Sequence, residues 1–83
     1  MDQGHPKFLI SSQVETYSGY RLHERPRRFT WGEKWLQVRR VLARWSGPDH
    51  LSFKVAAEDG RVFLLTYHQL ADAWEVKLKG PQE

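Results

Sequence analysis

The chain of 83 residues contains no cysteine and only one methionine. Without cysteine there is neither a disulfide framework nor a thiolate metal site, so burial of apolar surface has to stabilise the fold. No apolar run approaches the roughly 20 residues that cross a bilayer. Residues 1–6 also lack the basic and apolar regions of a secretory signal. These absences predict a bacterial-type cytoplasmic protein without a membrane partner.

Motifs for catalysis and for cofactors are also missing from the sequence. No serine lies in a nucleophile elbow, and no glycine-rich loop precedes a helix. None of the four histidines has a second ligand at metal-type spacing. Glu58 and Asp59 have the chemistry of a hairpin turn rather than of an acid and base pair. We therefore predict a protein that is not an enzyme, with no catalytic residues, no metal and no cofactor.

Aromatic side chains are abundant, with four Trp, three Tyr and four Phe. Each large ring removes more apolar area from water than an aliphatic side chain, which matters in a chain long enough for one thin core. Residues 1–12 mix Gly, Pro and Ser without a sustained period. We expect a flexible N-terminal arm over residues 1–12, a single β domain over 13–80 and a C-terminal tail over 81–83.

Alternation of apolar and polar residues predicts β-strands through most of the domain. The alternating segments are residues 14–22, 27–31, 51–56, 62–67 and 74–79. Pro26 cannot donate to a sheet ladder and is expected to begin its strand, and Asp59-Gly60 is a hairpin signal. The inward phases of the strands place Trp45, Phe53, Phe63, Leu65 and Val76 in one core.

The segment of residues 33–45 fits two local structures. Apolar residues recur at helical spacing at Trp35, Val38, Val41, Leu42 and Trp45. A strand requires a bulge at Arg39-Arg40, after which Val41, Ala43 and Trp45 face inward. The two alternatives are evenly balanced when the segment is taken alone. The β character of the remaining chain favours the bulged strand.

Positive charge is concentrated in residues 21–45, which contain eight cations and two acids, a net charge of +6. The other residues contain five cations and eight acids and sum to −3, so the overall +3 conceals one cationic segment. Arginine forks bind phosphates and aromatic rings stack on unpaired bases. The candidate nucleic-acid-binding residues are Arg27, Arg28, Trp31, Trp35, Arg39, Arg40 and Arg44. The alternative is that the arginines only solvate a β-surface, with Trp31 and Trp35 in the core.

Residues 19–78 contain the segments RPRRFTW, WLQVRRVLARW and WEVKL. This succession resembles an uncharacterised family of short bacterial all-β proteins with the pattern R-P-x-x-F followed by V-x-x-V-L-x-x-W. The matching positions are Arg25, Pro26, Phe29, Val38, Val41, Leu42 and Trp45. The resemblance implies a barrel-like β domain of unknown activity and favours the bulged strand over the helix.

These observations together predict an all-β fold, a small antiparallel meander of five or six strands. The meander curls into a barrel-like sheet with a long bulged strand around residues 34–45. The expected function is that of a small binding module, with weak binding of single-stranded nucleic acid through the Arg/Trp-rich face. The alternative is a protein interaction module that docks a partner through a sheet edge or an aromatic patch.

Overall fold

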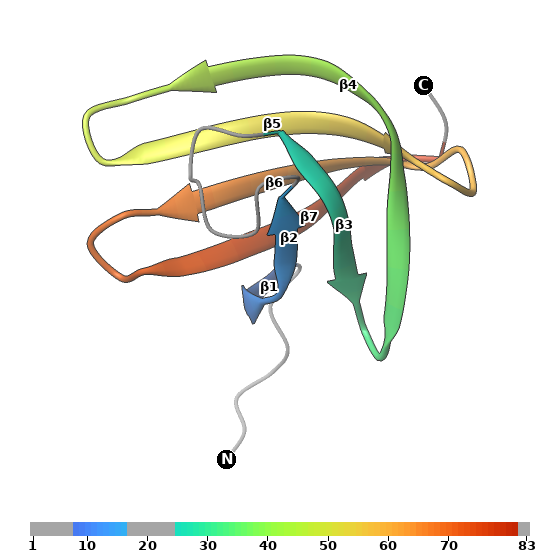
Figure 1. The fold of residues 1–83 in the computed structure, drawn as a ribbon, viewed down its shortest axis with the longest axis horizontal. Helices are drawn as coiled ribbons and strands as arrows, with labels where there is room; N and C mark the ends of the chain where they lie inside the picture. The colour runs from blue at the N-terminus through green and yellow to red at the C-terminus, as the bar shows by residue number, and fades with distance from the viewer. Residues whose placement is uncertain (1–7, 17–24, 82–83) are drawn as a thin grey trace.

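The computed structural model describes residues 8–16 and 25–81 of the chain. Every regular element within these two ranges is a β-strand (Figure 1). The strands are β1 (Phe8–Ser12), β2 (Val14–Thr16), β3 (Pro26–Trp31), β4 (Lys34–Ser46), β5 (His50–Ala57), β6 (Val62–His68) and β7 (Ala73–Gly80). No helix that could cross a membrane occurs within the described residues. The predicted all-β fold is confirmed, and β4 is the predicted long strand.

Six consecutive strands, β2 to β7, form an antiparallel meander in which each strand pairs with the next. β1 precedes this meander and pairs with its last strand, which gives the sheet order β1-β7-β6-β5-β4-β3-β2. The two edge strands, β1 and β2, are therefore separated in the chain by Gln13 alone. The sheet is curled, as predicted, so that one short segment reaches both of its edges (Figure 1).

The N-terminal arm predicted for residues 1–12 is wrong over Phe8–Ser12, because this segment is strand β1. Its register places Leu9 opposite Val76 of β7. A five-residue segment without alternation obtains its ladder partners only from the tertiary fold, which the sequence pattern does not show. Residues 1–7 and 82–83 lie outside the described residues, as does the part of the predicted strand 14–22 that follows Thr16.

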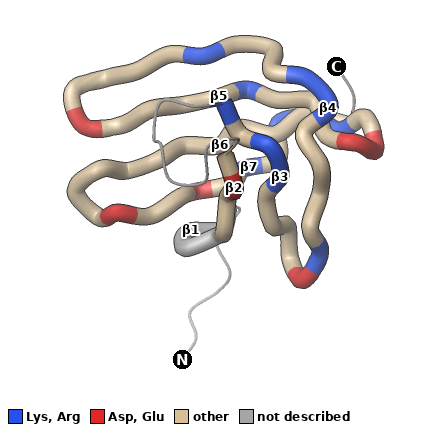
Figure 2. The backbone as a smooth tube through the Cα atoms, viewed as in Figure 1, with Lys and Arg blue, Asp and Glu red and all other residues tan. Residues whose placement is uncertain are grey.

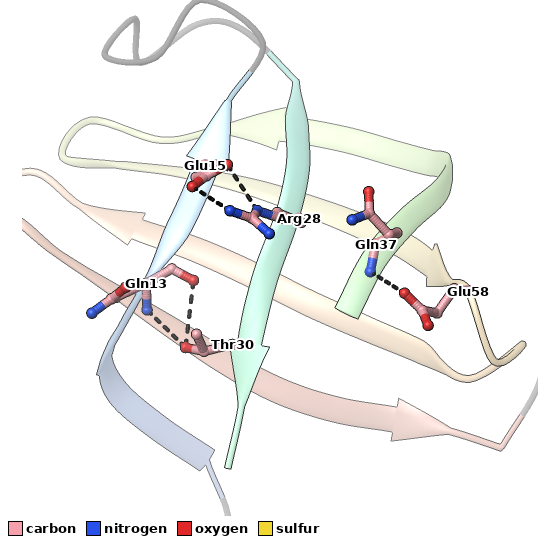
Figure 3. A network of polar contacts seen from close by, with 6 residues as sticks. All are labelled: Gln13, Glu15, Arg28, Thr30, Gln37 and Glu58. Carbon is pink, nitrogen blue, oxygen red and sulfur yellow. Dashed lines mark hydrogen bonds and ion pairs between the residues drawn. The ribbon is translucent and has the colours of Figure 1, made fainter. Parts of the chain in front are cut away.

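The change from one sheet edge to the other occurs at Gln13 (Figure 3). Its backbone N–H donates to the Thr30 hydroxyl at 3.0 Å, and its carbonyl accepts the Thr30 N–H at 2.9 Å. The backbone N–H and C=O of Gln13 thus both have a hydrogen-bond partner in Thr30 of β3. This pair fixes the N-terminal segment to β3 immediately after β1 leaves β7.

The core lies on the inner face of the curled sheet. Its buried members are Phe29, Leu36, Leu51, Phe53, Val55, Ala57, Phe63, Leu65 and Val76. Phe63 has edge contacts with Phe29 at 4.9 Å and with Trp31 at 5.2 Å between ring centroids. The predicted core positions of Phe53, Phe63, Leu65 and Val76 are confirmed. The prediction for Trp45 is wrong, since this residue is 48% exposed.

Two bulges in β4 explain the position of Trp45. The predicted bulge is present between Val38 and Arg40, and a second one follows between Val41 and Ala43. Each bulge leaves one residue without a ladder partner and exchanges the inner and outer phases of the strand. The second bulge therefore cancels the first, and Trp45 points to the outer face opposite Ser52. Because residues 41–43 are all apolar, alternation gives no sign of this second bulge.

The core assignment can be tested with two leucines of very different burial. Leu65 is fully buried, whereas Leu70, in the turn after β6, is 89% exposed. Leu65→Ala should lower the free energy of unfolding by about 2 to 5 kcal/mol because it leaves a cavity. Leu70→Ala should change it by no more than about 0.5 kcal/mol. Urea denaturation measures both, and equal midpoints for the two variants would contradict the assigned inner face.

Candidate nucleic-acid interface

The outer face of β4 contains two exposed tryptophans. Leu36 is buried opposite Phe29, so Trp35 and Gln37 point outward. Beyond the first bulge, the outward-facing positions are Arg40, Ala43 and Trp45. Trp35 is 37% exposed and Trp45 is 48% exposed. The two indole rings therefore lie on the same face of one strand, one on each side of Arg40.

A small depression at the bend of β4 is surrounded by cations, and we call it the arginine hollow. It has a volume of about 100 Å³ and is lined by Arg25, Pro26, Val38, Arg39, Arg40 and Val41. The first bulge of β4 and the beginning of β3 bring together arginines that are far apart in the sequence. Figure 2 shows Lys and Arg positions gathered along β3 and at this bend.

Three arginines and the apolar side chains Pro26, Val38 and Val41 line the arginine hollow, and no acid among the residues that the structure describes lines it. Pro26 is fully buried, and Val38 and Val41 pack against the core. Arg25, Arg39 and Arg40 each have an interaction within the protein. A guanidinium has five N–H donors, so these residues can also bind an anion. The hollow thus combines three arginines with three apolar side chains.

Arg27 is exposed on a bulge of β3 next to the arginine hollow. Arg28 pairs with Glu15 and Pro26 pairs with Thr16, which leaves Arg27 without a ladder partner. The side chain of Arg27 therefore does not point inward as the side chain of Phe29 does. Arg27 extends the positive surface along the chain from the hollow, although it does not line the hollow itself.

Arg28 is held in a fixed position between an acid and an aromatic ring. Its Nε donates to Glu15 Oε1 at 2.8 Å and its Nη2 donates to Glu15 Oε2 at 3.0 Å (Figure 3). Its guanidinium carbon lies 4.4 Å from the centroid of the Trp35 ring. A partly exposed ion pair contributes little stability, but this two-bond geometry orients the guanidinium over the indole. Arg28 thus positions Trp35.

The structure brings together only part of the predicted binding set. Arg39 and Arg40 line the arginine hollow, Arg27 lies beside it, and Trp35 lies on the adjoining outer face. Trp31 is turned toward the core, because it has the same phase as Phe29. Trp31 is therefore not available as a stacking platform.

Arg44 also lies apart from the outer face of β4. It pairs with Phe53, and its guanidinium carbon is 5.8 Å from the centroid of that ring. The second bulge gives Arg44 the inner phase, so its side chain lies on the opposite face from Trp45. The described structure therefore does not join Arg44 to the arginine hollow.

Sequence reasoning missed two residues of this interface, Arg25 and Trp45. Arg25 belongs to the cationic segment, but the proline that follows it was interpreted only as the beginning of a strand. Its proximity to Arg39 and Arg40 depends on how β3 meets the bend of β4. Trp45 was assigned to the core because the second bulge has no signal in the apolar residues around Leu42.

Other polar clusters do not form a recognisable site. His68 Nε2 and Glu75 Oε1 are 2.7 Å apart on the outer face of β6 and β7. Within the described ranges, no group of three or more His, Asp or Glu side chains is placed to hold a metal ion. The positive charge at the bend of β4 is the main electrostatic feature of this surface.

No family model, curated protein or solved structure matches the chain. The resemblance to short bacterial β proteins stays a prediction. The interface is thus defined by its geometry and charge alone.

The contact between Arg28 and Glu15 predicts a measurable pKa change. The hydrogen bond from Arg28, together with the charges of Arg28 and Arg27, lowers the pKa of Glu15 from its ordinary value. The ion pair therefore contributes to stability above the glutamate pKa of the unfolded chain. This contribution is lost as the pH falls through the lowered folded-state value.

Carboxyl carbon chemical shifts followed against pH should show the low pKa of Glu15 in the parent protein. The pKa should return toward the ordinary value in Arg28→Gln, which cannot form the ion pair. Asp59 provides an internal control, because the backbone N–H of Arg61 is the main cause of its lowered pKa. An unchanged Glu15 titration in Arg28→Gln would contradict the assigned contact.

Proposed function

We propose that the protein is a small binding module for single-stranded nucleic acid and that its interface follows the outer face of β4. The observation that supports this proposal is the arrangement of the arginine hollow between two exposed tryptophans. Arg39 and Arg40 provide positive charge in the middle of the face, and Trp35 and Trp45 provide aromatic surface toward its ends. Small β-domains that hold single strands combine these same two elements.

The length of the face suits several nucleotides. Leaving out the two bulged residues, Arg40 is four ladder positions from Trp35 and four from Trp45. At about 3.3 Å per residue, each half of the face is about 13 Å long, measured along the strand. β4 bends between its ends (Figure 1), so these lengths follow the curved strand. This span agrees with the lower part of the range of about 4 to 16 nucleotides for a small β-barrel.

The chemistry favours unpaired bases and little sequence preference. A planar guanidinium binds phosphate oxygens through a fork of N–H donors, and these contacts contain no sequence information. An indole can stack only on a base that has left the duplex stack. Arg28 lies over the Trp35 ring and holds it in place, which reduces the entropy lost when a base binds.

Binding should depend strongly on salt, through the phosphates that the arginines neutralise. Fluorescence anisotropy with labelled oligothymidylate should show an affinity that falls with salt, with a slope of about −0.7 for each neutralised phosphate. The double variant Arg39→Ala/Arg40→Ala should bind more weakly and lose about 1.4 from the magnitude of that slope. The matched control, Lys77→Ala/Lys79→Ala, removes the same charge from β7, three strands away in the sheet order. Its slope should equal that of the parent.

Stacking predicts separate losses at the two exposed tryptophans. Trp35→Ala and Trp45→Ala should each cost about 1 to 3 kcal/mol of binding free energy for each stacked base, with little change in the salt slope. Leu78→Ala is the control, because Leu78 is 41% exposed on β7 and has no aromatic ring. Parental affinity in both tryptophan variants would show that the bases do not stack on this face.

A second candidate function is docking of a partner protein at the edge of β4. Among the described residues, only β5 pairs with the segment from Val41 to Ser46, because β3 pairs with β4 only as far as Gln37. An extended partner segment could add to this edge as a further strand. The segment contains Arg44 and no acid, so an acidic partner fits it best. Absence of oligonucleotide binding at low salt and tens of micromolar protein would remove the nucleic-acid proposal and leave this one.

A further inference from the structure

We infer that the open edge of β4 binds an extended segment of a partner protein in which acidic and apolar residues alternate. The open edge is the side of residues 41–46 that faces away from β5. The inference rests on the second candidate function and specifies the chemistry and the register of the added strand. It is independent of the binding of nucleic acid, which we assign to the outer face of β4.

The edge is open along the distal half of a long strand. β3 pairs with β4 no further than Gln37, and β5 occupies the other side from Val38 onward. Figure 1 shows this half of β4 with β5 beside it and no labelled strand on its other side. At about 3.3 Å per residue, residues 41–46 present about 20 Å of edge. This length is that of an ordinary β-strand.

The hairpin that joins β4 to β5 shows which backbone groups point to the open edge. Gly47 N–H donates to the His50 carbonyl at 2.9 Å. In an antiparallel ladder, pairs that exchange hydrogen bonds alternate with pairs that do not. Counting back from Gly47, Trp45 exchanges hydrogen bonds with β5, whereas Arg44 and Ser46 occupy the intervening positions. The N–H and C=O groups of Arg44 and Ser46 therefore point to the open edge, where the described residues provide no ladder partner.

These backbone groups define one register for an added strand. An antiparallel segment can exchange hydrogen bonds with both Arg44 and Ser46, which places one of its residues directly opposite Trp45. Pro48 lies two residues after Ser46 and has no N–H, so the added ladder ends at Ser46. Successive residues of the segment lie on opposite faces of the sheet. The side chains of β4 on each face therefore specify every second residue of the partner.

The two faces at this edge differ in chemistry. On the outer face, Trp45 is 48% exposed and Ala43 is small, so an aromatic partner residue can pack across the strands against the indole. On the inner face, the guanidinium of Arg44 contacts the ring of Phe53. Within the described ranges, no carboxylate forms an ion pair with Arg44. An acidic partner residue opposite Arg44 thus adds an interaction that the fold does not already provide.

The charge of β4 disfavours a second copy of the same edge and favours an acidic partner. β4 contains four cations and no acid. Two such edges paired with each other bring like charges together, and like charges on paired strands are destabilising. Charged side chains on an edge strand are a common protection against self-association. A segment with glutamates on one face meets attraction in place of this repulsion.

The test uses the end-blocked hexapeptide Thr-Glu-Tyr-Glu-Val-Thr and ¹⁵N spectra of the full chain. Its tyrosine lies opposite Trp45 when its glutamates lie opposite Arg44 and Ser46. In the free protein, the amides of Arg44 and Ser46 should exchange rapidly with solvent and the amide of Trp45 slowly. Saturation with the peptide should slow the exchange of Arg44 and Ser46. Slow exchange of both amides in the free protein would show that the edge is already covered and would overturn the inference.

Two N-methylated peptides provide the matched control for strand addition. Methyl groups on both glutamate nitrogens remove the N–H groups that face Arg44 and Ser46, and should abolish binding. Methyl groups on the tyrosine and valine nitrogens replace N–H groups that point away from β4, and should preserve binding. Equal affinities of these two peptides would show that charge alone holds the peptide, which overturns the assigned geometry.

Ser46→Pro closes the edge in the protein itself. The lost N–H makes no ladder bond with β5, and proline is tolerated where the N–H of an edge strand faces solvent. This variant should keep the parental fold and lose peptide binding. Arg44→Gln should weaken binding about two- to fivefold, as expected for a partly exposed ion pair. Lys79→Gln removes one charge from β7 and should bind as the parent does.

Absence of binding by the unmethylated acidic peptide would overturn the inference and leave the nucleic-acid proposal intact. The oligothymidylate titrations decide that proposal separately, because they require neither the peptide nor the backbone groups of the open edge. A peptide with lysine in place of both glutamates should not bind. Binding of this basic peptide alone would overturn the acidic chemistry and leave docking at the edge of β4.

Discussion

The two bulges of β4 are the constraint on which the shape of the sheet and the composition of its outer surface depend. The first bulge inserts Arg39 into the strand and the second inserts Leu42. A bulge bends its strand and increases the local twist, and two of them within one long strand allow a short meander to curl strongly. Because the sheet curls, the segment around Gln13 can reach both of its edges. The same bulges decide which side chains of β4 point outward.

Charge and backbone geometry act together at this bend. A strand that is paired on one side only is at risk of pairing with other chains, and proteins reduce that risk with bulges and charged side chains. The distal half of β4 has both features, with Arg39, Arg40 and Arg44 distributed along it. These residues therefore suit the protection of an edge, and the proposed binding face uses the same concentration of charge. A protective role and a binding role require the same side chains here, so neither excludes the other.

The contacts of Arg28 connect the core of the domain to the proposed binding face. On the inner side of β3, Phe29 and Trp31 contact Phe63. On the outer side of the same strand, Arg28 contacts Glu15 and Trp35. The inner contacts fix the strand, and the outer contacts fix the indole. A platform that is ordered before a ligand binds loses less conformational entropy on binding. Arg28 therefore has a structural role in the cationic segment, because it orients the Trp35 ring.

The sequence by itself determined the β fold, because the alternation around Phe53, Phe63 and Val76 and the hairpin signal at Asp59-Gly60 are local properties of the chain. It also determined that positive charge is concentrated before residue 46, and it indicated the first bulge. Tertiary structure alone decided the pairing of Phe8–Ser12 with β7, since ladder partners distant in the chain have no local signal. It also decided the outward position of Trp45, because an apolar run conceals the phase of a strand. The meeting of Arg25 with Arg39 and Arg40 likewise required the sheet to curl, since proximity in space is a property of the folded backbone and not of residue spacing.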